Sequence, residues 1–332
     1  MRAVVLRSFG PYDDARVEDV AVPQPGPGEV LMEVHAAPVN FVDLLVISGK
    51  YQFLPKLPFT PGKGPVGVVT ALGEGVTNLK VGTRILAMAE QGGYAQYALA
   101  PAKSCYALPD GLSYTQAGAM SLAFDTSWFA LRERARLQPG ETVLVLGATG
   151  AVGQASVQLA KAMGARVLAG ISSRAKEAQA LAAGADGVVD LSAPDLRESL
   201  RAQVHAQTDG KGVDIILDPL GGDVFDAAIR ALAWCGRLVV IGFAAGHIPS
   251  VKVNYLLVKN IEVSGLQVSD YRKRRPEQVA QCYREVFDFY VQGKLKPLAA
   301  SELPLDNFAQ ALRAVEERTA QGRMILLPWS AA

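Results

Sequence analysis

The feature that most restricts how this chain can fold is an apolar strand that runs directly into a glycine-rich turn. Residues 142–146 have the composition of a buried strand, and glycines follow at positions 147, 150 and 153. Apolar residues then recur at helical spacing until Gly164, which predicts a helix that begins at the turn. Such glycines permit a tight turn, let backbone N–H groups approach a pyrophosphate, and let helix and strand pack closely.

The turn therefore predicts a dinucleotide site in which Gly150, Ala151 and Val152 contact phosphate. The alternative is a tight turn that binds nothing. The spacing Gly-x-x-Gly-x-x-Gly also differs from the more usual Gly-x-Gly-x-x-Gly.

The turn lies within a long region where strands alternate with helices. Alternation of this kind predicts a parallel sheet with helices on both faces. The expected strands are 142–146, 166–171, 187–190, 214–217 and 237–241. Before about residue 109, short apolar runs between turn signals predict a β-rich lobe. After residue 265 we expect helices at 277–291 and 304–317 and a strand at 323–327, an ending that could rejoin the first lobe.

Length and charge limit the class of protein. With 332 residues, half of them apolar, two lobes are expected, since single cores stop growing at roughly 250–300 residues. A net charge of +1 argues against a nucleic-acid binder, and no apolar run is long enough to suggest a membrane span. The apolar N-terminal run is too short for a signal peptide, and three scattered cysteines indicate no disulfide framework. We expect a soluble, cytoplasmic protein.

The segment after the second parallel strand predicts which dinucleotide is bound. NAD sites usually place an acid there, whereas NADP sites place cations. This segment contains no acid and offers Ser172, Ser173, Arg174 and Lys176. One charge-assisted hydrogen bond is worth about 1.5–3 kcal/mol, enough to decide between the two cofactors, so NADPH is expected. The alternative is a solvated first helical turn.

Several stretches together resemble the zinc-independent NADPH:quinone oxidoreductases of the medium-chain dehydrogenase/reductase superfamily, across essentially the whole chain. They are residues 38–43, 48–51, 58–62, 147–153 with 157–161, 218–222 and 242–246. The resemblance implies an α/β protein with a GroES-like, β-rich domain and a doubly wound Rossmann domain that has a parallel sheet. The implied boundaries are 1–123 with 267–332 for the first domain and 124–266 for the second, with NADPH in the cleft. It also implies a homodimer formed through the last Rossmann strand, about 261–266.

The resemblance and the ligand types together argue against a catalytic metal. Zinc-dependent relatives have a cysteine where this chain has Asn40, and Gly-His-Glu where it has Gly62-Lys63-Gly64. A catalytic zinc needs three suitable ligands, and the histidines at positions 35, 205 and 247 fall in unrelated segments. No metal site is expected.

The resemblance assigns the catalytic residues. Asn40 and Asp43 match the active-site pair beneath the nicotinamide, and Asn40 would also contact the cofactor; the alternative is a capped turn. Tyr51 matches a tyrosine that related enoyl reductases place beside the substrate, where a phenol can donate a proton. Its alternative is an aromatic wall without a proton role.

Four further residues complete the expected cofactor site. Thr126 resembles a threonine that touches the cofactor, and a helix N-cap is compatible with that role. Gly242, Phe243 and Asn254 are expected to edge the nicotinamide pocket, near the carboxyl ends of the strands. Asp218 is interpreted only as a residue that caps or turns the chain.

The chain departs from the family pattern at three places. Gly64 stands where a glutamate is usual, and Leu191 where some relatives have a tyrosine near the adenosine phosphate. Residues 272–275 form a run of four cations, which predicts a solvated loop or, alternatively, a site for an anionic substrate tail such as coenzyme A.

Three functions fit these residues. The first is an NADPH-dependent reductase of a small-molecule quinone or α,β-unsaturated carbonyl, and the second is a 2-enoyl thioester reductase. The third is an NADPH-binding protein with a structural or regulatory role and little turnover. Some relatives of that kind bind RNA, but this chain has neutral charge and no basic stripe.

Overall fold

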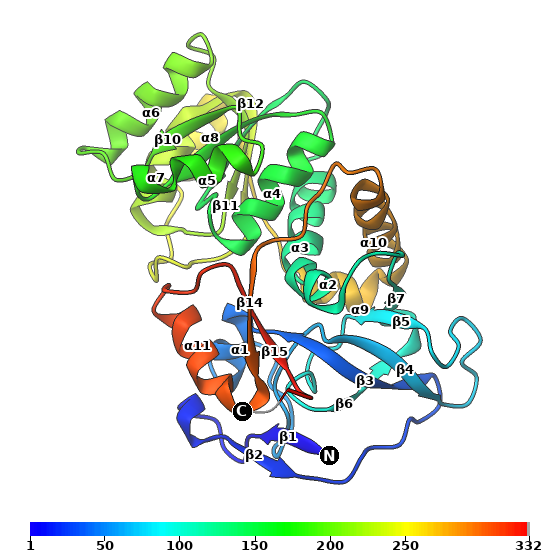
Figure 1. The fold of residues 1–332 in the computed structure, drawn as a ribbon. Coiled ribbons are helices and arrows are strands. Elements are labelled where there is room, and N and C mark those ends of the chain that lie inside the picture. The colour runs from blue at the N-terminus through cyan, green and yellow to red at the C-terminus, as the bar shows by residue number, and fades with distance from the viewer. Residues whose placement is uncertain (331–332) are drawn as a thin grey trace. The chain divides into compact units, whose positions relative to one another are not determined.

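Two large sheets organise the computed structural model, which describes residues 1–330, and each sheet belongs to a separate compact unit (Figure 1). The first unit consists of Met1–Leu122, Arg272–Phe287 and the residues from Pro297 onward. The second consists of Ala123–Tyr271 and Asp288–Lys296. The domain boundaries implied by the resemblance stay a prediction.

The first unit is built on a mostly antiparallel, β-rich sheet in which strands from both ends of the chain are neighbours. Its order is β14-β15-β3-β4-β5-β7, and β6 also pairs with β3. The last strand, β15, runs antiparallel to β3 and pairs Ile325 with Pro38. The strands of this unit are β1 (Arg2–Val5), β2 (Arg16–Asp19), β3 (Glu29–Pro38), β4 (Val66–Leu72), β5 (Arg84–Ala87), β6 (Tyr97–Pro101), β7 (Cys105–Ala107), β14 (Ala300–Pro304) and β15 (Arg323–Leu327).

Short helices accompany this sheet, and two further helices contribute residues to both units. The helices of the first unit are η1 (Tyr12–Asp14), α1 (Phe41–Ile47), η2 (Ala102–Ser104), α2 (Tyr114–Met120), η6 (Leu305–Asn307) and α11 (Phe308–Glu316). The two shared helices are α9 (Val268–Arg274) and α10 (Pro276–Val291). No helix within residues 1–330 combines the length and apolar character that a membrane crossing needs.

The second unit contains a six-stranded sheet that is parallel throughout, as the alternation of strands and helices predicted. Numbered within the unit, its strand order is 3-2-1-4-5-6, the order of the Rossmann fold, so the expected fold class is confirmed. Its strands are β8 (Thr142–Leu146), β9 (Arg166–Ile171), β10 (Gly187–Asp190), β11 (Val213–Asp218), β12 (Leu232–Val240) and β13 (Glu262–Gly265).

Helices cover both faces of this sheet. Leu144, Leu168 and Ile216 point to the face on which α6 and α7 pack, and the opposite face carries α4. The helices of this unit are α3 (Ala123–Phe129), η3 (Ala130–Arg134), α4 (Ala151–Ala162), η4 (Arg174–Lys176), α5 (Glu177–Ala182), α6 (Leu196–Gln207), α7 (Gly222–Ala228), η5 (Ile229–Ala231) and α8 (Val253–Lys259).

One strand begins earlier than expected. The sequence predicts a start at Arg237, whereas β12 begins at Leu232. Between these residues Cys235 has a positive φ of 61°, and the pairing with β11 shifts register between Val213 and Ile215. The irregularity interrupts the apolar pattern, which hides the first residues of the strand.

Candidate active site

The glycine-rich turn joins β8 to α4 and contains glycines with two different roles. Gly147 has a φ of 61°, which favours glycine, and a Cβ on Gly153 would overlap the carbonyl oxygen of Gly147. Both residues are therefore required by the packing of the chain itself. Gly150 is the N-cap of α4, with an ordinary φ of −75°, and its Cβ would meet only the Gly147 oxygen, at 3.4 Å. The packing of the protein does not require a glycine at position 150. A ligand that approaches the backbone closely would require one.

The first turn of α4 offers free backbone donors at the same place. The N–H groups in the first turn of a helix have no intrahelical acceptor, so those of Ala151 and Val152 are available to an anion. Ser127, on α3, braces this turn, because its Oγ lies 3.1 Å from the carbonyl oxygen of Val152 and accepts a hydrogen bond from Ser156 at 2.9 Å. Ser127 and Ser156 therefore link the first turn of α4 to α3.

Thr126 lies beside Ser127 in the fourth position of α3 and is half-buried. The helix begins at Ala123, so the interpretation of Thr126 as an N-cap is wrong. The polar residues on either side of Thr126, Asp125 and Ser127, gave no indication that the helix begins three residues earlier. The backbone N–H of Thr126 donates to Asp125 Oδ1 at 2.7 Å.

The segment after β9 presents its cations to solvent. Ser172 is exposed, and Ser173 caps the short helix η4, its Oγ accepting from the N–H of Ala175 at 3.3 Å. Arg174 and Lys176 lie on η4 and are exposed. The hydroxyl of Ser173 is thus engaged locally, while the two cations stand at the carboxyl end of β9, where a ribose phosphate would lie.

An acid that the sequence analysis did not consider lies next to these cations. Asp190 ends β10, the neighbour of β9, and its Oδ2 is 3.2 Å from Nε of Arg174. Hydrogen bonds from Ser192, with a smaller contribution from the charge of Arg174, lower the pKa of this carboxyl group. Its place at the end of an expected strand is the sequence signal that points to it.

The residues expected to edge the nicotinamide follow β12 and begin α8. Phe243 is partly exposed and lies against Gly221, where a Cβ would be 3.0 Å from the phenyl ring. Gly242 precedes it, and Asn254 is exposed in the first turn of α8. Asp218 ends β11, and its Oδ1 accepts from the N–H groups of Leu220 at 2.8 Å and Gly221 at 2.9 Å. This is the turn-forming role that the sequence suggested.

In the first unit, Asn40 and Asp43 form a buried polar cluster at the start of α1. Asn40 is the N-cap, and Asp43 Oδ2 accepts from its backbone N–H at 2.9 Å and its side-chain amide at 3.2 Å. The capped turn is therefore present. Two residues that the sequence did not suggest join it: Tyr94, whose hydroxyl donates to Asp43 at 3.0 Å, and Arg323, which donates to Asn40 Oδ1 at 2.6 Å.

Burial controls the protonation of this cluster. It raises the pKa of Asp43 to about 6, although the hydrogen bonds from Asn40 and Tyr94 and the charge of Lys63 oppose the shift. Burial also lowers the pKa of Arg323 to about 10 and raises that of the Tyr94 hydroxyl. Asp43 is the group in this cluster that titrates near neutral pH.

This pKa predicts a pH dependence of stability. The folded pKa of Asp43 lies about two units above the usual value. The stability that Asp43 contributes to the fold is therefore fully present below about pH 4 and is lost as the pH rises through 6. Relative to Asp43→Asn, the wild type should lose roughly 3 kcal/mol of unfolding free energy between pH 4 and pH 7. Urea unfolding at several pH values measures this difference, and a constant difference would contradict it.

Tyr51 is half-buried next to a second group of charges. The Lys63 ammonium lies 5.1 Å from the centroid of the Tyr51 ring and pairs with Glu90, whose other oxygen is 3.1 Å from Arg272. Lys63 and Arg272 are buried, and their charges lower the pKa of Glu90 against the effect of its burial. Lys63 also acts on Asp43, so the two groups of charges are electrostatically linked.

The structure explains one departure from the family pattern and corrects the reading of another. Gly64 has a φ of 70°, and a Cβ there would overlap Ser121 Oγ, so the fold leaves no room for a glutamate. The cation run is helical rather than a loop, because residues 272–274 end helix α9; Lys273, Arg274 and Arg275 are solvated as expected, but Arg272 is buried against Glu90. Lys273, which is exposed, lies 3.7 Å from the centroid of the Phe53 ring. Leu191 packs at the edge of the second-unit core.

Two family models match the chain in succession. The alcohol dehydrogenase GroES-like domain matches residues 26–110, and the zinc-binding dehydrogenase model matches residues 151–286. Despite the second description, no group of three or more His, Cys, Asp and Glu side chains in residues 1–330 is placed to hold a metal ion.

Similar proteins extend over nearly the whole chain. The quinone oxidoreductase-like protein 2 homolog of Nematostella vectensis is 36% identical over 304 residues, 91% of this chain and 82% of that protein. A mycobacterial quinone oxidoreductase structure is 31% identical, with a TM-score of 0.90, and covers 99% of this chain and 100% of its own. The Escherichia coli quinone oxidoreductase complexed with NADPH is 27% identical, with a TM-score of 0.89, over 99% and 100% of the two chains.

Proposed function

Because the chain belongs to the quinone oxidoreductase family of the medium-chain dehydrogenase/reductase superfamily, we propose that it transfers a hydride from NADPH to a quinone or an α,β-unsaturated carbonyl. The observation that carries this proposal is Gly150. The fold does not require a glycine there, and the neighbouring backbone donors suit a pyrophosphate. A similar protein, the quinone oxidoreductase of Escherichia coli, has been solved with NADPH.

Each unit would supply a different part of the chemistry. Residues Gly150, Ala151 and Val152 would hold the pyrophosphate, and Arg174 and Lys176 the ribose phosphate, with Ser172 and Ser173 alongside. Thr126, Gly242, Phe243 and Asn254 would border the rest of the cofactor. When bound, NADPH supplies the hydride, and the reduced acceptor carries negative charge on oxygen until a proton reaches it.

The first unit provides polar groups that could stabilise the negative charge on the product oxygen and deliver a proton to it. The Tyr51 phenol holds a proton that it can donate to the product oxygen, and the nearby Lys63 ammonium would stabilise negative charge there. Asp43 and Arg323 fix the side chain of Asn40 through its amide nitrogen and oxygen. No metal is needed for conjugate addition of a hydride, so we propose that the reaction is independent of zinc.

A substrate panel tests the proposal. NADPH oxidation is measured with a benzoquinone, a small enone and crotonyl-CoA, each also with NADH in place of NADPH. Turnover of the quinone or the enone is expected. Turnover of the thioester alone would identify an enoyl thioester reductase. The burial of Arg272 argues against this activity, because it leaves one exposed cation fewer to bind an anionic substrate tail. Tight NADPH binding without turnover would indicate a binding protein.

Arg174 should determine the choice between NADPH and NADH. Arg174→Gln removes a charge-assisted hydrogen bond to the 2′-phosphate, so NADPH affinity should fall roughly tenfold to a hundredfold while NADH affinity changes little. The surface contact with Asp190 does not prevent this role, because an exposed pair is easily exchanged for a phosphate contact. Calorimetry with both cofactors measures the ratio. Equal affinities of the wild type for NADH and NADPH would refute the preference.

Tyr51→Phe separates the two possible roles of this tyrosine. If the phenol donates the proton, kcat for the enone should fall by roughly 10²-fold or more, while NADPH affinity stays the same. The ring itself and its contact with Lys63 remain in the variant. Steady-state kinetics at several pH values provide the measurement, and unchanged turnover would leave only the aromatic wall.

We also propose a homodimer formed through β13. Within residues 1–330 this strand pairs on one side only, with β12, and Val253 and Leu257 of the preceding helix α8 are largely exposed. An open strand edge beside exposed apolar side chains favours association. Light scattering of the purified protein measures the mass.

A further inference from the structure

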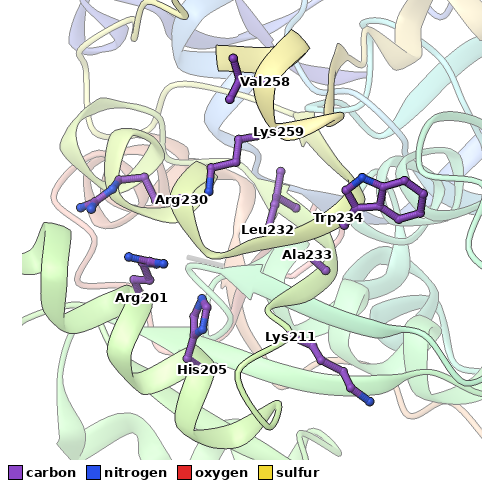
Figure 2. A pocket seen from close by; sticks show the side chains of 9 residues that line it. All are labelled: Arg201, His205, Lys211, Arg230, Leu232, Ala233, Trp234, Val258 and Lys259. Atoms are coloured by element: carbon purple, nitrogen blue, oxygen red, sulfur yellow. The ribbon is translucent and has the colours of Figure 1, made fainter.

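The second unit carries a cationic hollow that the proposed reaction does not use. It has a volume of about 270 Å³ and is shown in Figure 2. We define the cationic hollow by its lining residues, which come from α6, the loop before β11, η5, the amino-terminal part of β12, and α8. They are Arg201, His205, Lys211, Arg230, Leu232, Ala233, Trp234, Val258 and Lys259.

The hollow lies away from the proposed dinucleotide site. Lys211 precedes β11, Leu232 begins β12, and Lys259 ends the helix before β13, so the hollow is at the amino ends of the strands. The glycine-rich turn and Arg174 follow the carboxyl ends of β8 and β9. In a parallel sheet the amino ends and the carboxyl ends of the strands lie on opposite sides, so a ligand in the hollow would not compete with NADPH.

Two cationic side chains and a histidine converge on this space. Figure 2 shows the head groups of Arg201, His205 and Lys259 directed toward a common volume, whereas Lys211 is directed away from it. Arg201 and His205 are half-buried and one turn apart on α6. Arg230 is already paired, since its Nη1 lies 2.7 Å from Glu198.

The charge of the hollow is balanced by the protein only in part, since the pKa of Glu198 is lowered by its hydrogen bond from Arg230 and, less strongly, by the charge of Arg201, which forms no ion pair with it. No acidic side chain is among its lining residues, and in the part of the chain that the structure describes neither Arg201 nor Lys259 forms an ion pair. The nearest carboxylate, that of Glu198, lines a neighbouring hollow with Arg201 and is bound to Arg230. A concave surface lined by one sign of charge concentrates counter-ions, so this geometry favours an anion.

The size of the hollow and the shape of its cationic groups limit which anions it can bind. A guanidinium donates in a fork that matches two phosphate oxygens, and an ammonium adds a point charge. The volume is near the lower end for small-molecule sites, which suits a small ligand rather than an extended polymer. Trp234, which is 77% exposed, and Val258 add apolar surface at the hollow's edge.

We propose that the cationic hollow binds the phosphate group of a small phosphate ester, with Arg201 and Lys259 on the phosphate and Trp234 against the organic part. Inorganic phosphate shares the same anion chemistry but lacks the part that would contact Trp234. The two sources are therefore distinguished by whether Trp234 contributes to affinity.

Calorimetry with phenyl phosphate and with inorganic phosphate tests the proposal, in the presence and absence of saturating NADPH. Phenyl phosphate should bind once per chain, NADPH should not displace it, and the fluorescence of Trp234 should change. Arg201→Gln with Lys259→Gln should weaken binding at least tenfold, because each change removes a charge-assisted contact. NADPH affinity of this double variant, which shows that it is folded, should be unchanged.

Two matched variants complete the test. Lys80→Gln removes one exposed cation from the first unit and should leave phenyl phosphate binding unchanged. Trp234→Ala should weaken binding of phenyl phosphate but not of inorganic phosphate; equal loss for both, or none, would overturn the ester and leave inorganic phosphate. Absence of saturable binding to the wild type, displacement by NADPH, or full affinity of the double variant would overturn the site itself.

Discussion

Replacing Gly150 with valine is expected to weaken NADPH binding about a hundredfold while the unfolding temperature changes by only a few degrees. The side chain would occupy the space in which the pyrophosphate approaches the first turn of α4. Loss of roughly two charge-assisted hydrogen bonds corresponds to at least 3 kcal/mol, or a hundredfold in affinity. Isothermal titration calorimetry measures the affinity, and thermal denaturation measures the stability.

The small effect on stability follows from the backbone at this position. Gly150 has a φ of −75° and a ψ of 172°, which valine adopts without strain, and its Cβ has only one neighbour, at 3.4 Å. Replacing glycine at an N-cap by a residue that cannot cap costs about 1 kcal/mol or less. For a protein of this size that shifts the midpoint by about 1–2 °C.

Gly153→Ala is the matched comparison, because it should lower the stability of the fold through a clash within the protein itself. Its Cβ would overlap the carbonyl oxygen of Gly147 and lie 2.7 Å from the Cα of Ala148, and both are backbone atoms that cannot rotate away. This variant should lose about 1–3 kcal/mol of stability. If Gly150→Val bound NADPH as tightly as the wild type, the assignment of the turn to a phosphate would be wrong.

Arg323→Met should lower the unfolding free energy by about 3–5 kcal/mol. The side chain is buried, donates to Asn40 at 2.6 Å, and interacts electrostatically with Asp43. The change leaves the buried Oδ1 of Asn40 without its charged donor and removes a charge that partly compensates Asp43, and both losses are costly in the interior. Chemical denaturation at pH 7, where Asp43 is mostly ionised, measures the effect.

A double-mutant cycle isolates the electrostatic part of this loss. Arg323→Met combined with Asp43→Asn should be less destabilising than the sum of the two single changes, since the second removes the charge that the first exposes. Arg313→Met is the control, because Arg313 forms an exposed pair with Asp13 at 3.3 Å, and its loss should have little effect. Strict additivity in the cycle would show that Arg323 does not compensate Asp43.

The sequence predicted the second unit well because its signals are local. The glycines, the apolar runs of β8 and β9 and the helical spacing after Gly150 all lie within a few residues of one another. Alternation of strands and helices then restricts the topology to a parallel sheet. The short irregularity at Cys235 was enough to conceal the beginning of β12.

The charged partners of the candidate site could not be predicted in the same way. Arg323 is separated from Asn40 by 283 residues, and Glu90 from Arg272 by 182. No periodicity in the sequence connects such residues, and four consecutive cations ordinarily indicate a solvated surface. Only the pairing of β15 with β3 shows why one arginine near the end of the chain is buried beside Asn40.

That same strand pairing determines the order in which the protein can be completed on the ribosome. Every strand of the parallel sheet has been synthesised by Gly265, whereas β3 must wait for β15, which begins only at Arg323. Nascent chains fold as their parts emerge, so the parallel sheet of the second unit can form first while the sheet of the first unit stays open at one strand edge. A premature stop codon just before Arg323 would therefore spare the parallel sheet of the second unit and prevent the sheet of the first unit from closing.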